Sequence, residues 1–123
     1  MSKTIAAIMA VCALLPLPAW AQSTSSILPV KTGAYAPVAG GCEAAAAAFI
    51  YIEDKGIGAN KTSGKVLSVK HNGNSYVLDV LWIEAGSDDA HGDRDKVQID
   101  VRDEHSFFFS NTTSNKTLMR WCS

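Results

Sequence analysis

The dipeptide Asn72-Gly73 separates two runs of strand-forming residues, and this arrangement constrains the fold more than any other feature of the chain. The first run covers residues 64–71, and the second, 74–84, is built largely from Val, Leu, Ile, Tyr and Trp. Asn-Gly accepts positive φ at both central positions of a two-residue type I′ turn, whose twist suits antiparallel strands. The sequence therefore predicts a β-hairpin with its turn at Asn72-Gly73.

The second strand of this hairpin is apolar on both faces. Alternation places Tyr76, Leu78, Val80 and Trp82 on one face and Val77, Asp79, Leu81 and Ile83 on the other. This pattern predicts a central strand that is covered on both sides. Asp79 interrupts the apolar pattern, so we expect it to lie at an edge, to have a raised pKa, or to pair with Lys or Arg, and we favour the ion pair.

Further strands follow at spacings of roughly ten residues. They are expected over residues 97–102, 105–109 and 117–121, with turn-forming residues between them. Residues 43–48 are rich in Ala and permit a helix, whereas residues 49–52 favour a strand. We favour at most a short helical turn that leads into a strand at residues 48–53, with one helix through Asp54 as the alternative. The predicted fold is mainly β, a small antiparallel meander sheet or barrel.

The first 21 residues have the three parts of a secretory signal peptide. Lys3 precedes an apolar run at residues 5–17, and Ala19-Trp20-Ala21 offers small residues before a cut after Ala21. The run is shorter than the ~20 apolar residues that span a bilayer, and Pro16 and Pro18 interrupt it. We expect residues 1–21 to be removed, which predicts a periplasmic or secreted bacterial protein with no membrane segment left.

Removal of residues 1–21 would leave two cysteines, Cys42 and Cys122, in a compartment where disulfides persist. Neither has a second Cys at C-x-x-C spacing or a neighbouring His, the pattern that a metal site or redox site would show. The sequence therefore predicts a disulfide that staples the fold almost end to end.

The remaining chain is long enough for one domain. Residues 22–30 are Ser/Thr-rich without periodicity, which predicts a disordered N-terminus before a single β-rich domain at residues 31–123. All 12 acidic residues lie after the predicted cut, against 10 of the 11 Lys and Arg residues, because only Lys3 would be lost. This near balance disfavours a nucleic-acid-binding protein, which needs a basic face.

The densest polar cluster lies in the stretch between the second hairpin strand and Val97. It contains Asp88, Asp89, His91, Asp93 and Asp95. Carboxylates at this density could bind calcium. An EF-hand loop, however, needs Gly at its sixth position and Glu at its twelfth, whereas counting from Asp89 places Gly92 fourth and Asp100 twelfth. We therefore favour a solvated loop without a metal or other cofactor, whose acidic groups contact a protein partner.

Three consecutive phenylalanines cannot share one face of a strand. If Phe107 and Phe109 enter the core, Phe108 faces outward, where it is either covered by the sheet or free to anchor a partner. No nucleophile motif of the G-x-S-x-G type accompanies the three histidines. We therefore expect an exported, non-catalytic binding protein, such as an inhibitor or immunity protein of a cell-envelope enzyme. The alternative is a module that binds a small ligand or a metal.

Overall fold

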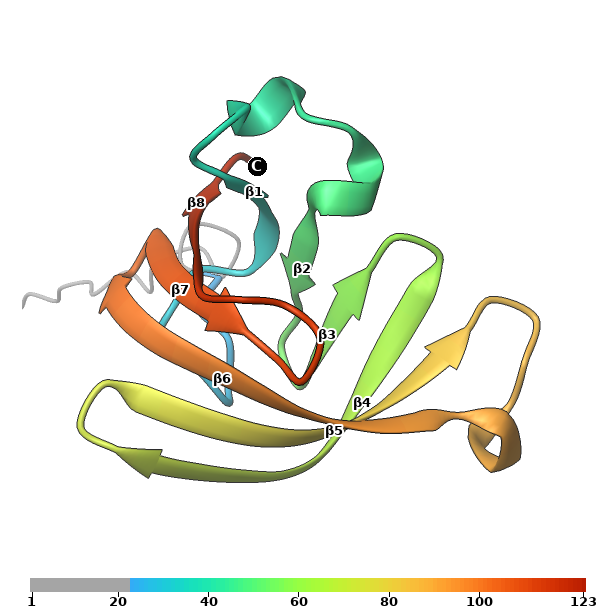
Figure 1. The fold of residues 1–123 in the computed structure, drawn as a ribbon. Coiled ribbons are helices and arrows are strands. Elements are labelled where there is room, and N and C mark those ends of the chain that lie inside the picture. The colour runs from blue at the N-terminus through green and yellow to red at the C-terminus, as the bar shows by residue number, and fades with distance from the viewer. Residues whose placement is uncertain (1–22) are drawn as a thin grey trace, which may run out of the picture.

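The computed structural model describes residues 23–123, and these form a closed barrel of eight antiparallel strands (Figure 1). Each strand pairs with the next in sequence, and the last strand pairs with the first. The strands are β1 (Gly33–Pro37), β2 (Ile50–Ile52), β3 (Gly56–Ala59), β4 (Thr62–Asn72), β5 (Ser75–Glu84), β6 (Asp93–Asp103), β7 (Ser106–Ser110) and β8 (Thr117–Trp121). The predicted antiparallel barrel is confirmed. The predicted signal peptide, residues 1–21, lies outside the described residues.

The hairpin formed by β4 and β5 is confirmed, but its turn is shifted by one residue. Asn72 pairs with Ser75, so the two loop residues are Gly73 and Asn74. Gly73 has a φ of 62°, which an L side chain rarely adopts. Gly at the first loop position is the pattern of a type II′ turn, so the predicted type I′ turn at Asn72-Gly73 is wrong.

Apolar side chains that point inward fill the barrel. The core consists of Leu28, Val30, Tyr35, Ile50, Ile52, Ile57, Leu78, Val80, Val97, Ile99, Phe107, Phe109 and Met119. On β5, Leu78 and Val80 are fully buried, whereas Val77, Leu81 and Ile83 are only half-buried on the outer face. The prediction that β5 is covered on both sides is therefore wrong, because the outer face of a small barrel meets solvent.

A β-bulge in β4 keeps its apolar residues directed inward. The β4–β5 register shifts between Val66 and Ser68, which leaves Leu67 without a partner and 43% exposed. Val66 and Val69, three residues apart, consequently both pack against the core. Nearer the start of β4, a Cβ added to Gly64 would lie 2.7 Å from Ile57 atoms and 2.9 Å from the Trp82 ring, so this glycine makes room for both side chains.

Strand β3 was not predicted, because its sequence, Gly-Ile-Gly-Ala, resembles a turn more than a strand. It nevertheless pairs with both β2 and β4, and its Ile57 is fully buried. β3 reaches along β4 only as far as Lys65, so the rest of β4 pairs with β5 alone. This leaves one side of the barrel to be closed by another segment.

The segment at residues 23–30 lies against the barrel there, which contradicts the prediction that residues 22–30 are disordered. Leu28 and Val30 are buried in the core. The backbone is held by hydrogen bonds from the Ser25 amide to the Val30 carbonyl at 2.9 Å and from the Ser26 amide to the Asp54 carbonyl at 2.8 Å. The Ser/Thr-rich composition concealed a short apolar run at residues 27–30 that fills the barrel. We call residues 23–30 the N-terminal plug.

The seam of the barrel is the β1–β8 pair, and a disulfide lies beside it. Cys42, in the short 3-10 helix η2 (Gly41–Glu43), is bonded to Cys122, as predicted, with Cα atoms 5.7 Å apart. A second 3-10 turn, η3 (Ala46–Ala48), leads into β2. This confirms the expected short turn before a strand and rules out the alternative of one helix through Asp54. No helix within residues 23–123 combines the length and apolarity that crossing a membrane requires.

Candidate functional site

Strands β5 and β6 continue well past β7, and their connection projects from the barrel (Figure 1). We call this connection, residues 85–92, the β5–β6 tip. It contains the 3-10 turn η4 (Asp89–His91). Pairing between β5 and β6 extends as far as Trp82 and Asp93, and β4 pairs with β5 up to Glu84. The tip therefore extends from a stem of three strands in which β6 is the free edge. β6 thus begins at Asp93, four residues before the predicted strand start at Val97.

One ion pair and one contact between a histidine and a carboxylate hold the side chains of the tip. Lys65 Nζ lies 2.9 Å from Asp89 Oδ2, and His91 Nδ1 lies 2.6 Å from Asp88 Oδ1. Both carboxylates remain more than half exposed. Residues 84–93 contain four carboxylates and neither Lys nor Arg, so the tip and its stem present negative charge to solvent. Asp88, Asp89, His91 and Asp93 are all exposed, and their role in binding a partner stays a prediction.

Asp95 does not belong to that exposed cluster. It accepts hydrogen bonds from Trp82 Nε1 at 3.0 Å, Asn111 Nδ2 at 3.0 Å and Thr112 Oγ1 at 2.8 Å. Burial raises the pKa of Asp95, but the hydrogen bonds from Thr112, Trp82 and Asn111 outweigh it and lower the pKa below its usual value. Asp95 therefore ties the β7–β8 loop to β5 and is a structural residue.

We expect Asp95→Asn to lower the free energy of unfolding at pH 7 by about 1–3 kcal/mol, because the amide nitrogen would face groups that are themselves donors. A carboxylate whose pKa is depressed in the folded state stabilises the fold above its unfolded pKa, and that contribution is lost on acidification. The difference from wild type should therefore shrink below about pH 4. Urea titrations at pH 7 and pH 3 measure both effects. Asp93→Asn, an exposed carboxylate on the same strand, is the control and should change little; equal effects of the two variants would contradict this role for Asp95.

Asp79 pairs with Lys96, which confirms the favoured expectation for this residue. Lys96 Nζ lies 3.0 Å from Asp79 Oδ1, and Ser68 Oγ donates to Asp79 Oδ2 at 2.9 Å. These two hydrogen bonds, the one from Lys96 first, lower the pKa of Asp79. Asp79 is accordingly a charged surface residue that links three strands.

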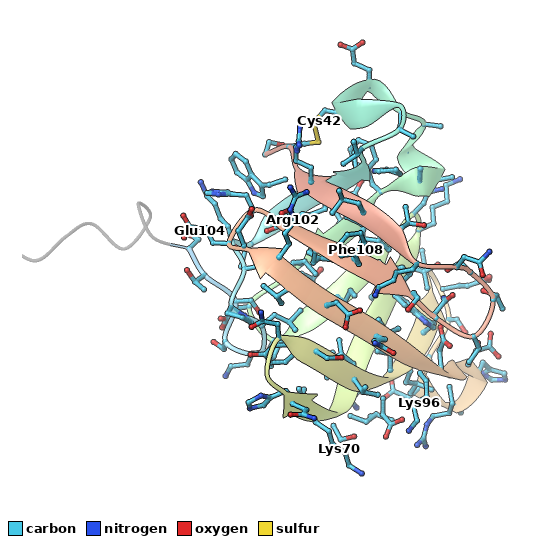
Figure 2. The ribbon with its side chains drawn as sticks, turned by 60° about the vertical axis from the view of Figure 1, so that its left-hand side comes forward. Cys42, Lys70, Lys96, Arg102, Glu104 and Phe108 are labelled. Carbon is cyan, nitrogen blue, oxygen red and sulfur yellow. A yellow bond between two sulfur atoms is a disulfide. The ribbon has the colours of Figure 1, made fainter. Side chains whose placement is uncertain are left out.

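Phe107 and Phe109 point into the barrel, and Phe108 points outward, as expected. Phe108 is half-buried, and Lys116 Nζ lies 5.4 Å from the centre of its ring. Figure 2 shows Phe108 on the barrel wall, between Arg102 and Lys96 in that view. The β5–β6 tip and Phe108 therefore do not form one continuous site, and the anchoring role of Phe108 remains a prediction.

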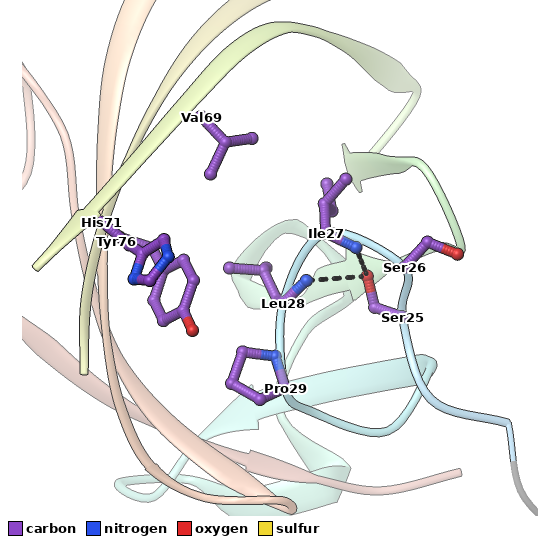
Figure 3. Close-up of a pocket in the computed structure, with 8 residues that line it drawn as sticks. All are labelled: Ser25, Ser26, Ile27, Leu28, Pro29, Val69, His71 and Tyr76. Atoms are coloured by element: carbon purple, nitrogen blue, oxygen red, sulfur yellow. Dashed lines mark hydrogen bonds between the residues drawn. The ribbon is translucent and has the colours of Figure 1, made fainter. Parts of the chain in front are cut away.

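A groove that the sequence did not reveal lies between the N-terminal plug and the end of the β4–β5 hairpin (Figure 3). Its volume is about 530 Å³. It is lined by Ser25, Ser26, Ile27, Leu28, Pro29, Val69, His71 and Tyr76. The rings of His71 and Tyr76 are stacked with centroids 4.9 Å apart. Ser25 Oγ accepts from the amides of Ile27 and Leu28, so this hydroxyl shapes the plug rather than facing a ligand unpaired.

The three histidines lie in separate places, with His71 on Tyr76, His91 beside Asp88, and His105 against Trp121. Within residues 23–123, no three side chains of His, Cys, Asp or Glu converge in a way that could hold a metal ion. The acidic cluster spreads along the tip and its stem because β6 begins within it, and its side chains therefore point in different directions.

By its fold and surface, the molecule is a closed antiparallel β-barrel with a filled interior and one projecting acidic tip. Comparison with family models, curated proteins and solved structures found no match to this chain. The function is consequently inferred from the barrel and its surface residues.

Proposed function

We propose that the chain is an exported, non-catalytic binding protein that recognises a protein partner in the cell envelope, as an inhibitor or immunity protein recognises its enzyme. One observation carries the proposal: the β5–β6 tip projects from a barrel whose interior is filled with side chains. Since the described core has apolar side chains where a ligand-binding barrel has its cavity, recognition would use the outside of the molecule.

The structure of the tip suits insertion into a basic cleft. Its stem is a hydrogen-bonded ladder, and the pairs Lys65–Asp89 and Asp88–His91 restrict its side chains before binding. A loop that is already ordered loses less conformational entropy when it binds. Exposed carboxylates would also steer a positively charged partner toward the tip and raise the association rate constant.

Site-specific photocrosslinking tests this proposal. A photoreactive amino acid replaces Ala90 in the tip, and a control protein carries it at Lys70, which pairs with Val77 near the opposite end of β5 from the tip. In periplasmic extract of the producing organism, the tip probe is expected to crosslink one specific protein and the Lys70 probe is not. Equal labelling from both positions, or none from the tip, would contradict the proposal.

Charge variants define the role of the carboxylates once the partner is purified. The double variant Asp88→Asn/Asp93→Asn is expected to lower the association rate constant about ten-fold at low salt, with a smaller effect at high salt. Glu43→Gln, an exposed carboxylate in η2 beside the disulfide, is the matched control. If the partner is an enzyme, its inhibition by the wild-type chain distinguishes an inhibitor from another binding protein.

The alternative function, binding of a small ligand, is favoured by the groove beside the N-terminal plug. Its volume of about 530 Å³ and its His71–Tyr76 stack are within the range of ligand sites. Native mass spectrometry of protein purified from its own host distinguishes this function. The groove would be favoured over the tip if the wild-type protein retains a small molecule, Tyr76→Ala loses it, and the probe at position 90 crosslinks no protein.

A further inference from the structure

A second cavity, of about 280 Å³, differs in character from the acidic tip, because cationic and polar groups line it. Its lining residues are Arg102, Asp103, His105, Ser106, Arg120 and Trp121. They come from β6, β7, β8 and the turn between β6 and β7. We call this cavity the arginine pocket. Figure 2 shows Arg102 near Glu104, on the side of the barrel away from Lys96.

A β-bulge places one of the two arginines. The β6–β7 register passes from the pair Val101–Phe107 to the pair Asp103–Ser106, so Arg102 is the additional residue. Arg120 lies on β8 as the direct partner of Ser106. Within residues 23–123, neither Arg102 nor Arg120 has a carboxylate within 4.0 Å of its guanidinium nitrogens. Two guanidinium groups without ion pairs therefore border one serine.

Ser106 is the second, independent sign of a binding site. It is 6% exposed, and its Oγ has no hydrogen-bond partner in the described part of the chain. Hydrogen bonding by the His105 amide lowers the pKa of Asp103 most, and the nearby Ser106 hydroxyl lowers it second. The Ser106 hydroxyl nevertheless makes no hydrogen bond of ordinary distance and angle to that carboxylate. A buried hydroxyl without a partner is costly, and a ligand that accepts its hydrogen bond would remove the cost.

The charge around the pocket favours an anion. Arg102 and Arg120 line the pocket, and a third cation, Lys31, lies with its Nζ 4.0 Å from the centre of the Trp121 ring. The nearby carboxylates are Asp103 and Glu104. Asp103 already accepts from the His105 amide at 2.8 Å, and Glu104 lies 3.7 Å from His105.

We propose that the arginine pocket binds one small oxyanion group, a carboxylate or a phosphate, with Arg102 and Arg120 as charged donors. Ser106 Oγ, which is buried in the free chain, would turn toward the ligand as a third donor. Guanidinium groups suit such a ligand because two parallel N–H bonds match two oxygens. The indole of Trp121 forms an apolar wall for the remainder of the ligand. This site is independent of the β5–β6 tip.

NMR titration of the wild-type chain without residues 1–21 tests the site. Sodium acetate and inorganic phosphate serve as separate probes at constant ionic strength. The expected result is a saturable shift of the amides of residues 102–106 and of the Trp121 indole N–H. Saturation by one probe at the lower concentration identifies that chemistry, carboxylate or phosphate. Shifts that rise linearly with both probes would overturn the proposal.

Variants separate a built site from general surface charge. Arg102→Gln and Arg120→Gln should each weaken binding about ten-fold or more, and Ser106→Ala several-fold. Arg94→Gln is the matched control, because Arg94 lies on the same strand as Arg102 but beside the tip. An equal loss with Arg94→Gln would show non-specific attraction and overturn the proposal. Because Arg102 and Arg120 are exposed, their variants should retain the wild-type spectrum elsewhere.

Discussion

Replacing both Cys42 and Cys122 with Ser is expected to lower the free energy of unfolding by about 4.5 kcal/mol. The disulfide closes a loop with a sequence separation of 80 residues, and the chain-entropy relation gives about this value for that length. A domain of this size has a total stability of about 5–15 kcal/mol, so the disulfide would supply roughly a third or more of it. Urea unfolding monitored by circular dichroism measures the change.

Reduction of the wild-type protein provides the control for this experiment. Excess reductant should bring the wild-type unfolding midpoint close to that of the double Ser variant and leave the variant unchanged. If the variant retains the wild-type midpoint, the disulfide does not stabilise the barrel, and the adjoining β1–β8 hydrogen bonds alone hold the seam.

Leu28→Ala in the N-terminal plug is expected to cost about 2–5 kcal/mol, the range for truncation of a fully buried leucine. Leu28 is 2% exposed and packs in the core. Leu67→Ala is the matched control, since Leu67 is 43% exposed at the β4 bulge and should change stability by less than about 0.5 kcal/mol.

Equal effects of Leu28→Ala and Leu67→Ala would contradict the buried position of the plug. Hydrogen exchange gives a second measurement. The Ser25 and Val30 amides donate to the Val30 and Leu28 carbonyls, respectively, and should exchange slowly in the wild type and faster in Leu28→Ala.

The strands that could be predicted are those whose apolar residues alternate or form a continuous run. β6 shows alternation, with Val97, Ile99 and Val101 separated by polar residues, whereas β5 and β7 were recognised as runs of β-branched and aromatic residues. Asn72-Gly73 located the turn of the β4–β5 hairpin within one residue. β3 could not be predicted because Gly-Ile-Gly-Ala has almost no side chain with strand preference; β2 and β4 on either side impose its conformation. The N-terminal plug was missed because Ser and Thr outweigh its short apolar run, although that run supplies Leu28 and Val30 to the core.

The candidate site was predictable in part, for a similar reason. The acidic residues of the β5–β6 tip form a cluster in the sequence, whereas Asp95 in the same cluster turns toward Trp82 because β6 has already begun. The arginine pocket brings together Arg102, Ser106 and Arg120, which are distant in sequence and become neighbours only through the β6–β7–β8 pairing. No local pattern indicates such a site.

The closed seam has a consequence for how the molecule reaches its folded form. Because β8 must pair with β1, the ring stays open until residues 117–121 have been synthesised. Every shorter intermediate exposes two unpaired strand edges, which are templates for aggregation. Distant pairings of this kind also make folding slow, on the order of milliseconds to seconds. A chaperone that shields these edges should therefore increase the yield of folded barrel, with a smaller effect on the stability of the barrel once it has folded.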